Sequence, residues 1–446
     1  MSLEILYILL CLSLIIGVIF LYKLEGKVLF TQINIFNWTY FVEFIAMGAV
    51  SPFFILDIKP NNWAIQKIPD SDFPIKEVIL TLCWCAITIP LGIFFMKKIL
   101  EYFRLHRDFF KFQKIKEIEQ CSNFFYFFWI IIFFIYSLYL IGQIGFIPQL
   151  KLFSLSSIQE IAKLRGDITH NLPANIIIFR LIGLAISPIL CYSAFAKFLK
   201  NKNMFSFGLF LTLFLFTVFF NTLNLNKSAI AFILVGLAAT FPLLGLNFSI
   251  KKMLIFTTAI VLILVTMFTI TIPGRSIKSA LSNLKGRVLI SQTYGNYASF
   301  YVFPKHIEHI GFRSVTKQIK KIGLEPKERA SRTLMKFMAP EAVKNGTAGH
   351  MVSTFFAEAW ANWGLIGIIL SPIFVGLSLK FLVNLLIWLP KSELSIGFLS
   401  FLTYTFGINK SFSKILFPRY LIAAFIILFS FKIIEKKFYL KKKNHH

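Results

Sequence analysis

Long windows of apolar residues, separated by shorter polar stretches, recur along most of this 446-residue chain. A helix needs roughly twenty apolar residues to cross a bilayer core about 30 Å thick. By this measure we expect about eleven transmembrane helices, with no sequence left over for a soluble domain. They are expected at 5–22, 38–56, 78–96, 124–140, 176–196, 205–220, 229–246, 253–272, 356–379, 394–408 and in a last segment ending near Phe431. Residues 1–446 are thus predicted to form a single all-α, polytopic transmembrane domain.

The composition supports this class. Hydrophobic residues make up 57% of the chain, 54 residues are Phe, and the mean hydropathy is +0.72. A water-soluble domain of this length carries far fewer apolar residues. We therefore expect the lipid bilayer as a partner, and no nucleic acid.

Basic residues in short loops predict the orientation, because they are held in the cytoplasm during insertion. Three basic loops, at 97–116, 197–202 and 251–252, fall on one side when eleven spans are assumed, and so do the C-terminal lysines. This places the N-terminus in the periplasm and the C-terminus in the cytoplasm. It also places residues 273–352, between the eighth and ninth spans, in the periplasm as one large loop.

That loop is strongly basic, with fourteen Lys and Arg against four Glu. Loops longer than about 60 residues escape the charge rule, so insertion does not require this charge. We interpret it as serving an anionic ligand; the alternative is a face that lies on anionic lipid headgroups. Within the loop, the aromatic stretch 294–304 is predicted to lie at the membrane surface, and 315–322 and 327–338 to form short amphipathic helices.

Charged residues in or beside spans are costly and are therefore functional candidates. Arg180 lies about one turn inside the fifth span, although snorkelling to the headgroups would also explain it. Lys227 joins the sixth and seventh spans, where it is also compatible with a simple turn. A short external loop near the C-terminus breaks the charge rule, which a bound anion would explain. Its basic residues are Lys410, Lys414 and Arg419.

Two titratable residues lead into the ninth span, His350 and Glu358, eight residues apart. This spacing places both on one face of a helix. An imidazole, or a partly desolvated carboxylate, can take the proton from a sugar hydroxyl near neutral pH. The alternative is that the two residues only cap a helix start.

At these residues the chain resembles the bacterial oligosaccharide-repeat-unit polymerases, the Wzy-type O-antigen polymerases, including the enterobacterial common antigen type. The resemblance is carried by Phe355-Phe-Ala-Glu-Ala-Trp-Ala-Asn-Trp-Gly-Leu-Ile-Gly, by Gly286-Arg-Val-Leu-Ile-Ser-Gln, and by the polar turn before the seventh span. The family usually has Gly-Ser-Arg or Gly-Thr-Arg at that turn, where this chain has Leu225-Asn-Lys. His350 is similar to a histidine of the related O-antigen ligases.

The resemblance implies a GT-C-like fold and a hexosyltransferase that polymerises undecaprenyl-diphosphate-linked oligosaccharides at the periplasmic face of the bacterial inner membrane. The product would be an O-antigen, a common antigen or a capsule. The substrate serves as both donor and acceptor, no cofactor or metal is expected, and a Wzz-type chain-length regulator is a further expected partner.

The expected roles follow from this chemistry. Basic side chains stabilise the charge that develops on a diphosphate leaving group. Glu358 is the first candidate for the proton acceptor and His350 the second, while Tyr294 and Trp360 would stack on sugar rings. The residues expected at the diphosphate are Arg275, Arg287, Lys227, Arg419, Lys410 and Arg180.

Three alternatives stay open at this point. Asp70-Ser-Asp72 has the D-x-D form with which some glycosyltransferases hold a divalent ion. A lipid-linked oligosaccharide flippase would also need basic residues, but it commonly shows two related halves, which are not evident here. An O-antigen ligase is the closer rival.

Overall fold

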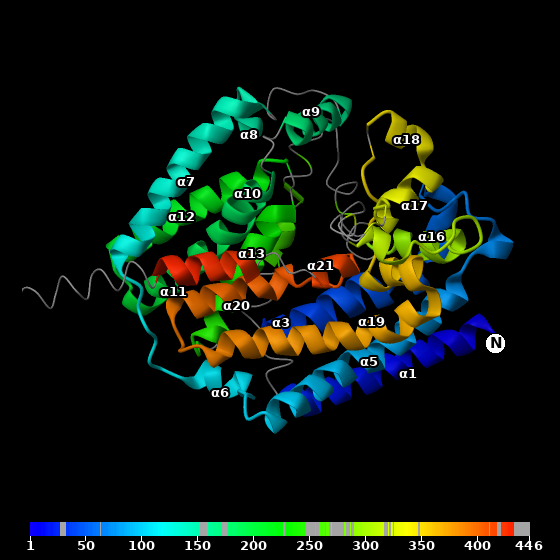
Figure 1. Cartoon of the computed structure of the whole chain (residues 1–446), viewed down its shortest axis with the longest axis horizontal. Helices are drawn as coiled ribbons and strands as arrows, with labels where there is room; N and C mark the ends of the chain where they lie inside the picture. The colour runs from blue at the N-terminus through cyan, green and yellow to red at the C-terminus, as the bar shows by residue number, and fades with distance from the viewer. Residues whose placement is uncertain are drawn as a thin grey trace, which may run out of the picture.

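The fold is that of a computed structural model of the chain, drawn in Figure 1. The structure describes residues 1–26, 33–62, 64–151, 158–171, 176–225, 228–246, 255, 258–263, 265–266, 269, 281, 286, 290–315, 320, 323, 325–346, 348–409, 411–416 and 421–431. In this part of the chain the regular structure is helical, and the β-contact is an isolated parallel bridge between Glu119 and Ser392. The predicted all-α class is confirmed.

The helices vary greatly in length. The α-helices are α1 (Leu3–Glu25), α3 (Ile35–Asn37), α4 (Ile55–Ile58), α5 (Ile75–Tyr102), α6 (Phe109–Lys114), α7 (Asn123–Ile144), α8 (Pro148–Lys151), α9 (Ile158–Asn171), α10 (Ile176–Leu181), α11 (Ser187–Asn201), α12 (Met204–Thr222), α13 (Ser228–Leu243), α16 (Tyr294–Val302), α17 (Ala330–Met338), α18 (Pro340–Lys344), α19 (Phe355–Trp388), α20 (Glu393–Thr405) and α21 (Phe412–Leu416). The π-helices are η1 (Trp38–Ala49) and η6 (Ile182–Ile186). The 3₁₀ helices are η2 (Ser51–Phe53), η3 (Lys59–Asn61), η4 (Asp70–Asp72) and η7 (Gly311–Ser314).

Seven helices in the described part of the chain are long and apolar enough to cross a membrane. Each coincides with a span expected from the sequence, so this is a helical membrane protein. The seven are Leu3–Glu25, Asp70–Tyr102, Asn123–Ile144, Ile178–Asn201, Met204–Thr222, Phe355–Trp388 and Phe412–Phe431.

The other four expected spans have different outcomes. Residues 38–56 form the 12-residue η1 and then a 3₁₀ turn at Pro52, whose ring cannot continue a helix. The spans expected at 229–246 and 394–408 correspond to α13, of 16 residues, and α20, of 13. Most of 253–272 lies outside the described residues.

Two helix layers make up the bundle. In one, α5 packs against both α1 and α19, and these three run side by side in Figure 1. In the other, α11 packs against α12 and α20. The α5–α19 crossing is close because Gly92 and Gly376 meet there. A Cβ on either would lie 2.2 Å from a carbonyl oxygen of the facing helix. Small residues at such crossings let membrane helices pack tightly.

The two ends of the bundle differ in what covers them. We define the α16 end as the one that holds the start of α1 together with α16, α17 and α18 (Figure 1). The opposite end, which we call the α6 end, holds α6 and the C-terminal ends of α5 and α19. The N-terminus and the described part of the long basic loop thus share one end, as the span count predicts.

The long loop is more deeply packed than the sequence suggests. Tyr297 and Phe303 are fully buried, and α16 packs against α19. The Tyr297 and Phe303 rings therefore pack inside the protein, while the position of 294–304 relative to the membrane stays a prediction. The amphipathic helix expected at 327–338 is present as α17, which buries Leu334, Met335 and Met338. Most of 315–322 lies outside the described residues.

Helix α19 is broken near its start. Gly364 has φ +57° and ψ −135°, a backbone conformation essentially restricted to glycine. The break frees the Ala361 carbonyl, which accepts a hydrogen bond of 2.9 Å from the backbone N–H of Ile310. A backbone group inside a membrane protein needs such a partner, so the long loop completes the broken helix.

Replacing Gly364 with Ala is expected to destabilise the protein by about 1–3 kcal/mol, the cost of holding another residue in this region. The added Cβ would also lie 2.9 Å from Nε2 of His309. Thermal unfolding in detergent measures the effect. Gly142→Ala on α7 is the control, because no atom lies within 4 Å of its added Cβ. Equal melting temperatures for the two variants would contradict this account of the break.

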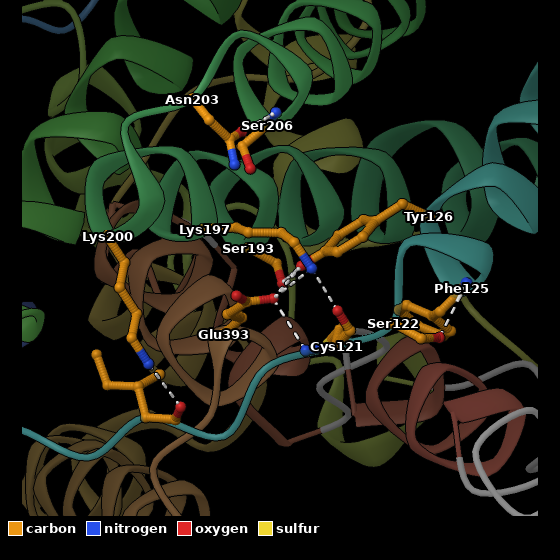
Figure 2. A network of polar contacts seen from close by, with 11 residues as sticks. Cys121, Ser122, Phe125, Tyr126, Ser193, Lys197, Lys200, Asn203, Ser206 and Glu393 are labelled. Carbon is orange, nitrogen blue, oxygen red and sulfur yellow. Dashed lines mark hydrogen bonds and ion pairs between the residues drawn. The ribbon is translucent and has the colours of Figure 1, made fainter. Parts of the chain in front are cut away.

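A buried polar network joins three helices at the α6 end (Figure 2). Oε2 of Glu393, at the start of α20, accepts hydrogen bonds of 3.0 Å from the backbone N–H of Cys121 and from the Tyr126 hydroxyl on α7. Lys197 on α11 lies 3.8 Å from the same oxygen and also donates to the Cys121 carbonyl. One buried ion pair thus fixes α7, α11 and α20 relative to one another.

Candidate functional site at the start of the broken helix

The first turns of α19 hold a buried carboxylate. Glu358 is 3% exposed, and its Oε2 accepts a 2.7 Å hydrogen bond from the backbone N–H of Ser413. Its Oε1 accepts a 3.1 Å hydrogen bond from the Ser413 hydroxyl. The start of α19 is itself held by α16, since Asn296 Oδ1 accepts from the backbone N–H and the hydroxyl of Thr354, both at 2.9 Å. Glu358 therefore couples the broken helix to α21.

His350 lies on the irregular segment that precedes α19, so it does not share one helix face with Glu358, as the eight-residue spacing predicted. His350 is exposed, and its Nδ1 lies 3.1 Å from the hydroxyl of Ser331 on α17. Arg332 donates hydrogen bonds of 2.8 and 2.6 Å to the carbonyls of Ala348 and Gly349, which fixes this segment on α17. The histidine is thus held in place by a basic helix.

Three cations interact with His350, and we call Arg329, Arg332 and Lys414 the basic cluster. Arg329 and Lys414 interact electrostatically with both His350 and Glu358. Partial burial, and then the charges of Arg329, Arg332 and Lys414, hold the pKa of His350 below its ordinary value. Its imidazole is therefore neutral at neutral pH, so it can accept a proton beside side chains that can bind an anion.

The lowered pKa of His350 has a measurable consequence. Only neutral imidazole reacts with diethyl pyrocarbonate. The pH at which the modification rate of His350 is half of its maximum is therefore expected to lie below 6.5, the ordinary pKa of histidine. Arg329→Gln removes a positive neighbour, so its midpoint should move to higher pH. Mass spectrometry of the His350 peptide follows the reaction, and Lys344→Gln on α18 is the control. A midpoint that does not respond to Arg329→Gln would contradict the electrostatic account.

Most of the expected diphosphate ligands are not placed by the structure. Arg180 is exposed on α10 and has contacts of its own, so its role stays a prediction. The remaining five lie outside the described residues: Arg275, Arg287, Lys227, Lys410 and Arg419.

The two aromatic residues expected at the sugar lie near the site. Tyr294 begins α16 and is half-buried. Trp360 stacks on Phe300, with ring centroids 4.7 Å apart, and its Nε1 donates to the Phe303 carbonyl at 3.0 Å. His309 meets the same ring edge-on at 5.4 Å. Phe300 thus already covers part of the Trp360 ring that a sugar would use.

The D-x-D pair has other partners. Asp70 forms an ion pair with Lys59, and Asp72 with Lys305 at 2.7 Å. In the part of the chain that the structure describes, no group of three or more His, Cys, Asp or Glu is arranged to hold a metal ion. These contacts account for both aspartates.

A third buried carboxylate, Glu43, was not predicted from the sequence. Glu43 lies within η1 and is 5% exposed. Its Oε2 accepts a 2.6 Å hydrogen bond from the backbone N–H of Ile408, and its Oε1 accepts one of 3.1 Å from Trp38. Glu43 and Glu358 thus hold the two ends of segment 408–413. A carboxylate within an apolar window was the signal that could have revealed it.

Comparison with known proteins gives no relative. No family model, curated protein or solved structure matches the chain.

Proposed function

We propose that the protein is a metal-independent glycosyltransferase that polymerises undecaprenyl-diphosphate-linked oligosaccharide repeat units into a surface polysaccharide. In this proposal it lies in the bacterial inner membrane with eleven spans and a GT-C-like arrangement. Its N-terminus and α16 end face the periplasm, and its C-terminus faces the cytoplasm.

One observation carries the proposal. At one end of a helical membrane bundle, His350 and Glu358 both interact electrostatically with Arg329 and Lys414. Glycosyl transfer from a lipid diphosphate needs this combination, a proton acceptor for the attacking hydroxyl and cations for the departing diphosphate. The remaining basic residues of the long loop add to the attraction of an anionic substrate.

The reaction would proceed as a displacement at the anomeric carbon of the donor. An acceptor sugar hydroxyl forms the new carbon–oxygen bond, and the bond from the anomeric carbon to the diphosphate breaks. The diphosphate leaves with the bonding electron pair and is stabilised by the basic cluster. The hydroxyl proton passes to the enzyme.

Between the two candidate proton acceptors, accessibility favours His350. Both oxygens of Glu358 accept hydrogen bonds from Ser413, and the side chain is 3% exposed. His350 is exposed, and it is neutral at neutral pH because its pKa is lowered. We therefore assign the proton transfer to His350. Glu358 is then the positioning residue that holds α21, and with it Lys414, beside the histidine.

Deleting the gene in its source bacterium tests this function against both alternatives. Loss of a polymerase leaves surface glycans of a single repeat unit. Loss of a ligase leaves finished polymer on undecaprenyl diphosphate and none on the final acceptor. Loss of a flippase leaves repeat units on the cytoplasmic face. Either of the last two results would overturn the proposal.

A further inference from the structure

Four lysines in the described part of the chain are buried, and three of them have a carboxylate partner. Lys59 pairs with Asp70, Lys197 with Glu393, and Lys380 with Glu25. The fourth, Lys391, is 4% exposed and forms no ion pair with any described carboxylate. A buried ammonium without a counter-ion is costly, so this site is electrostatically incomplete.

The Lys391 ammonium is only partly satisfied by the protein. It donates hydrogen bonds of 2.8 Å to the Gln113 carbonyl and 2.7 Å to the Ile115 carbonyl. An ammonium has three N–H donors, so one is left without an oxygen acceptor. The ammonium also lies over the Phe112 ring, 5.6 Å from its centroid. Burial lowers the pKa of Lys391 to about 8, as expected for a cation that lacks an anionic neighbour.

Lys391 lines a cavity of about 510 Å³ at the α6 end. Arg107 and Lys111 also line it, and both are exposed. Its acidic lining residue, Asp108, is already engaged, because Oδ1 accepts from the backbone N–H groups of Phe110 and Lys111 at 2.8 and 3.1 Å. The rest of the wall is largely apolar and includes Trp388. The cavity therefore combines three cations with one carboxylate, His106 and a largely apolar wall, and the cations are in excess.

The surroundings of the cavity indicate a membrane surface. Tyr102, Phe103 and Trp388 are 83%, 63% and 52% exposed, and aromatic side chains gather at the headgroup level of bilayers. The part of α19 from residue 365 to Trp388 separates this end from the candidate active site by roughly 35 Å, at about 1.5 Å per residue. That is about the thickness of the apolar core, so we infer that the cavity is at the membrane face opposite the candidate active site.

We propose that this cavity binds the phosphate headgroup of an anionic phospholipid, with Arg107, Lys111 and Lys391 on the phosphate and Trp388 beside the acyl chains. Basic pockets between membrane helices bind such headgroups. A lipid bound there would connect the segment before α6 to the loop between α19 and α20. The site is separate from the proposed active site and does not depend on it.

Native mass spectrometry of the purified full-length protein, with phosphatidylglycerol or phosphatidylcholine added, tests the proposal. The wild type is expected to retain phosphatidylglycerol and to release phosphatidylcholine. Each basic residue near a bilayer contributes about fivefold in affinity, so Arg107→Gln/Lys111→Gln should bind phosphatidylglycerol about 25-fold more weakly. Arg107 and Lys111 are exposed, so this double variant should fold. It tests the site even if a Lys391→Met variant fails to fold.

The matched control removes the same charge elsewhere. Lys76→Gln/Lys344→Gln changes two exposed lysines, on α5 and α18 at the α16 end, and should retain phosphatidylglycerol as the wild type does. Millimolar inorganic phosphate forms a third arm. If inorganic phosphate displaces the lipid, the cavity is an anion site whose ligand is a soluble phosphate and not a lipid. Equal retention of both lipids, or equal loss in both double variants, would overturn the proposal.

Discussion

Replacing His350 with Gln is expected to slow glycan elongation by about 10²–10⁴-fold, the usual contribution of a general base. Gln keeps much of the size and polarity of His but cannot accept the hydroxyl proton. The measurement is the initial rate of product formation by purified protein with a lipid-linked repeat unit. Wild-type activity should fall at acid pH as His350 becomes protonated, and the residual activity of His350→Gln should lack this acid limb.

His306→Gln is the matched control for this variant. His306 lies in the same loop, but its ring packs against Tyr301 and Phe337 at centroid distances of 4.8 and 5.2 Å. It should keep nearly full activity. If His350 transfers the proton, His350→Gln loses the acid limb of the pH–activity profile and keeps its melting temperature. If His350 acts only in folding, the melting temperature changes instead. Near-normal rates for a folded His350→Gln would exclude His350 as the proton acceptor.

Replacing Lys197 with Met is expected to destabilise the protein by about 3–5 kcal/mol, because it leaves the Glu393 carboxylate buried without its cation. The Lys197 and Glu393 side chains are 6% and 1% exposed. Oε1 of Glu393 has no hydrogen-bond partner among the described residues, so the charge depends on the contacts at Oε2. Denaturation in mixed detergent micelles measures the loss.

A second substitution separates the charge effect from simple loss of packing. Lys197→Met/Glu393→Gln removes both charges, while the Gln carbonyl can still accept from Cys121 and Tyr126, so most of the lost stability should return. The exposed pair Lys98–Glu101, at 2.9 Å, is the control, since breaking a surface pair has little effect. Additive losses in the double variant would contradict a coupled pair.

Hydropathy predicts the long helices of this protein well, because a helix that crosses a bilayer needs an unbroken apolar window. It is less reliable for the short elements. Pro52 interrupts the window at 38–56, and the Ser392–Ser395 capping box sets the start of the 13-residue α20. The break in α19 was not predicted, because glycine is common in membrane helices and only the loop around Ile310 shows why Gly364 is needed.

The candidate site was predicted in part. The cost of a charge beside a span identified Glu358. The helical spacing that linked it to His350 was wrong, because residues 348–354 are irregular and α19 begins only at Phe355. Their partners come from elsewhere in the chain. Ser413 lies 55 residues after Glu358, and Ser331 lies 19 residues before His350. Arg329 could not be distinguished from the other cations of its loop by sequence alone, since only the packing of α17 brings it to the histidine.

Reconstitution of the purified protein with a synthetic undecaprenyl-diphosphate repeat unit, in chelator, tests the central proposal most directly. Products are resolved by length on a gel, and the repeat unit must be the native one. We expect the wild-type protein to give a ladder that grows by one repeat unit at a time. A folded wild-type protein that yields no ladder, or yields one only when a divalent metal is restored, would contradict it.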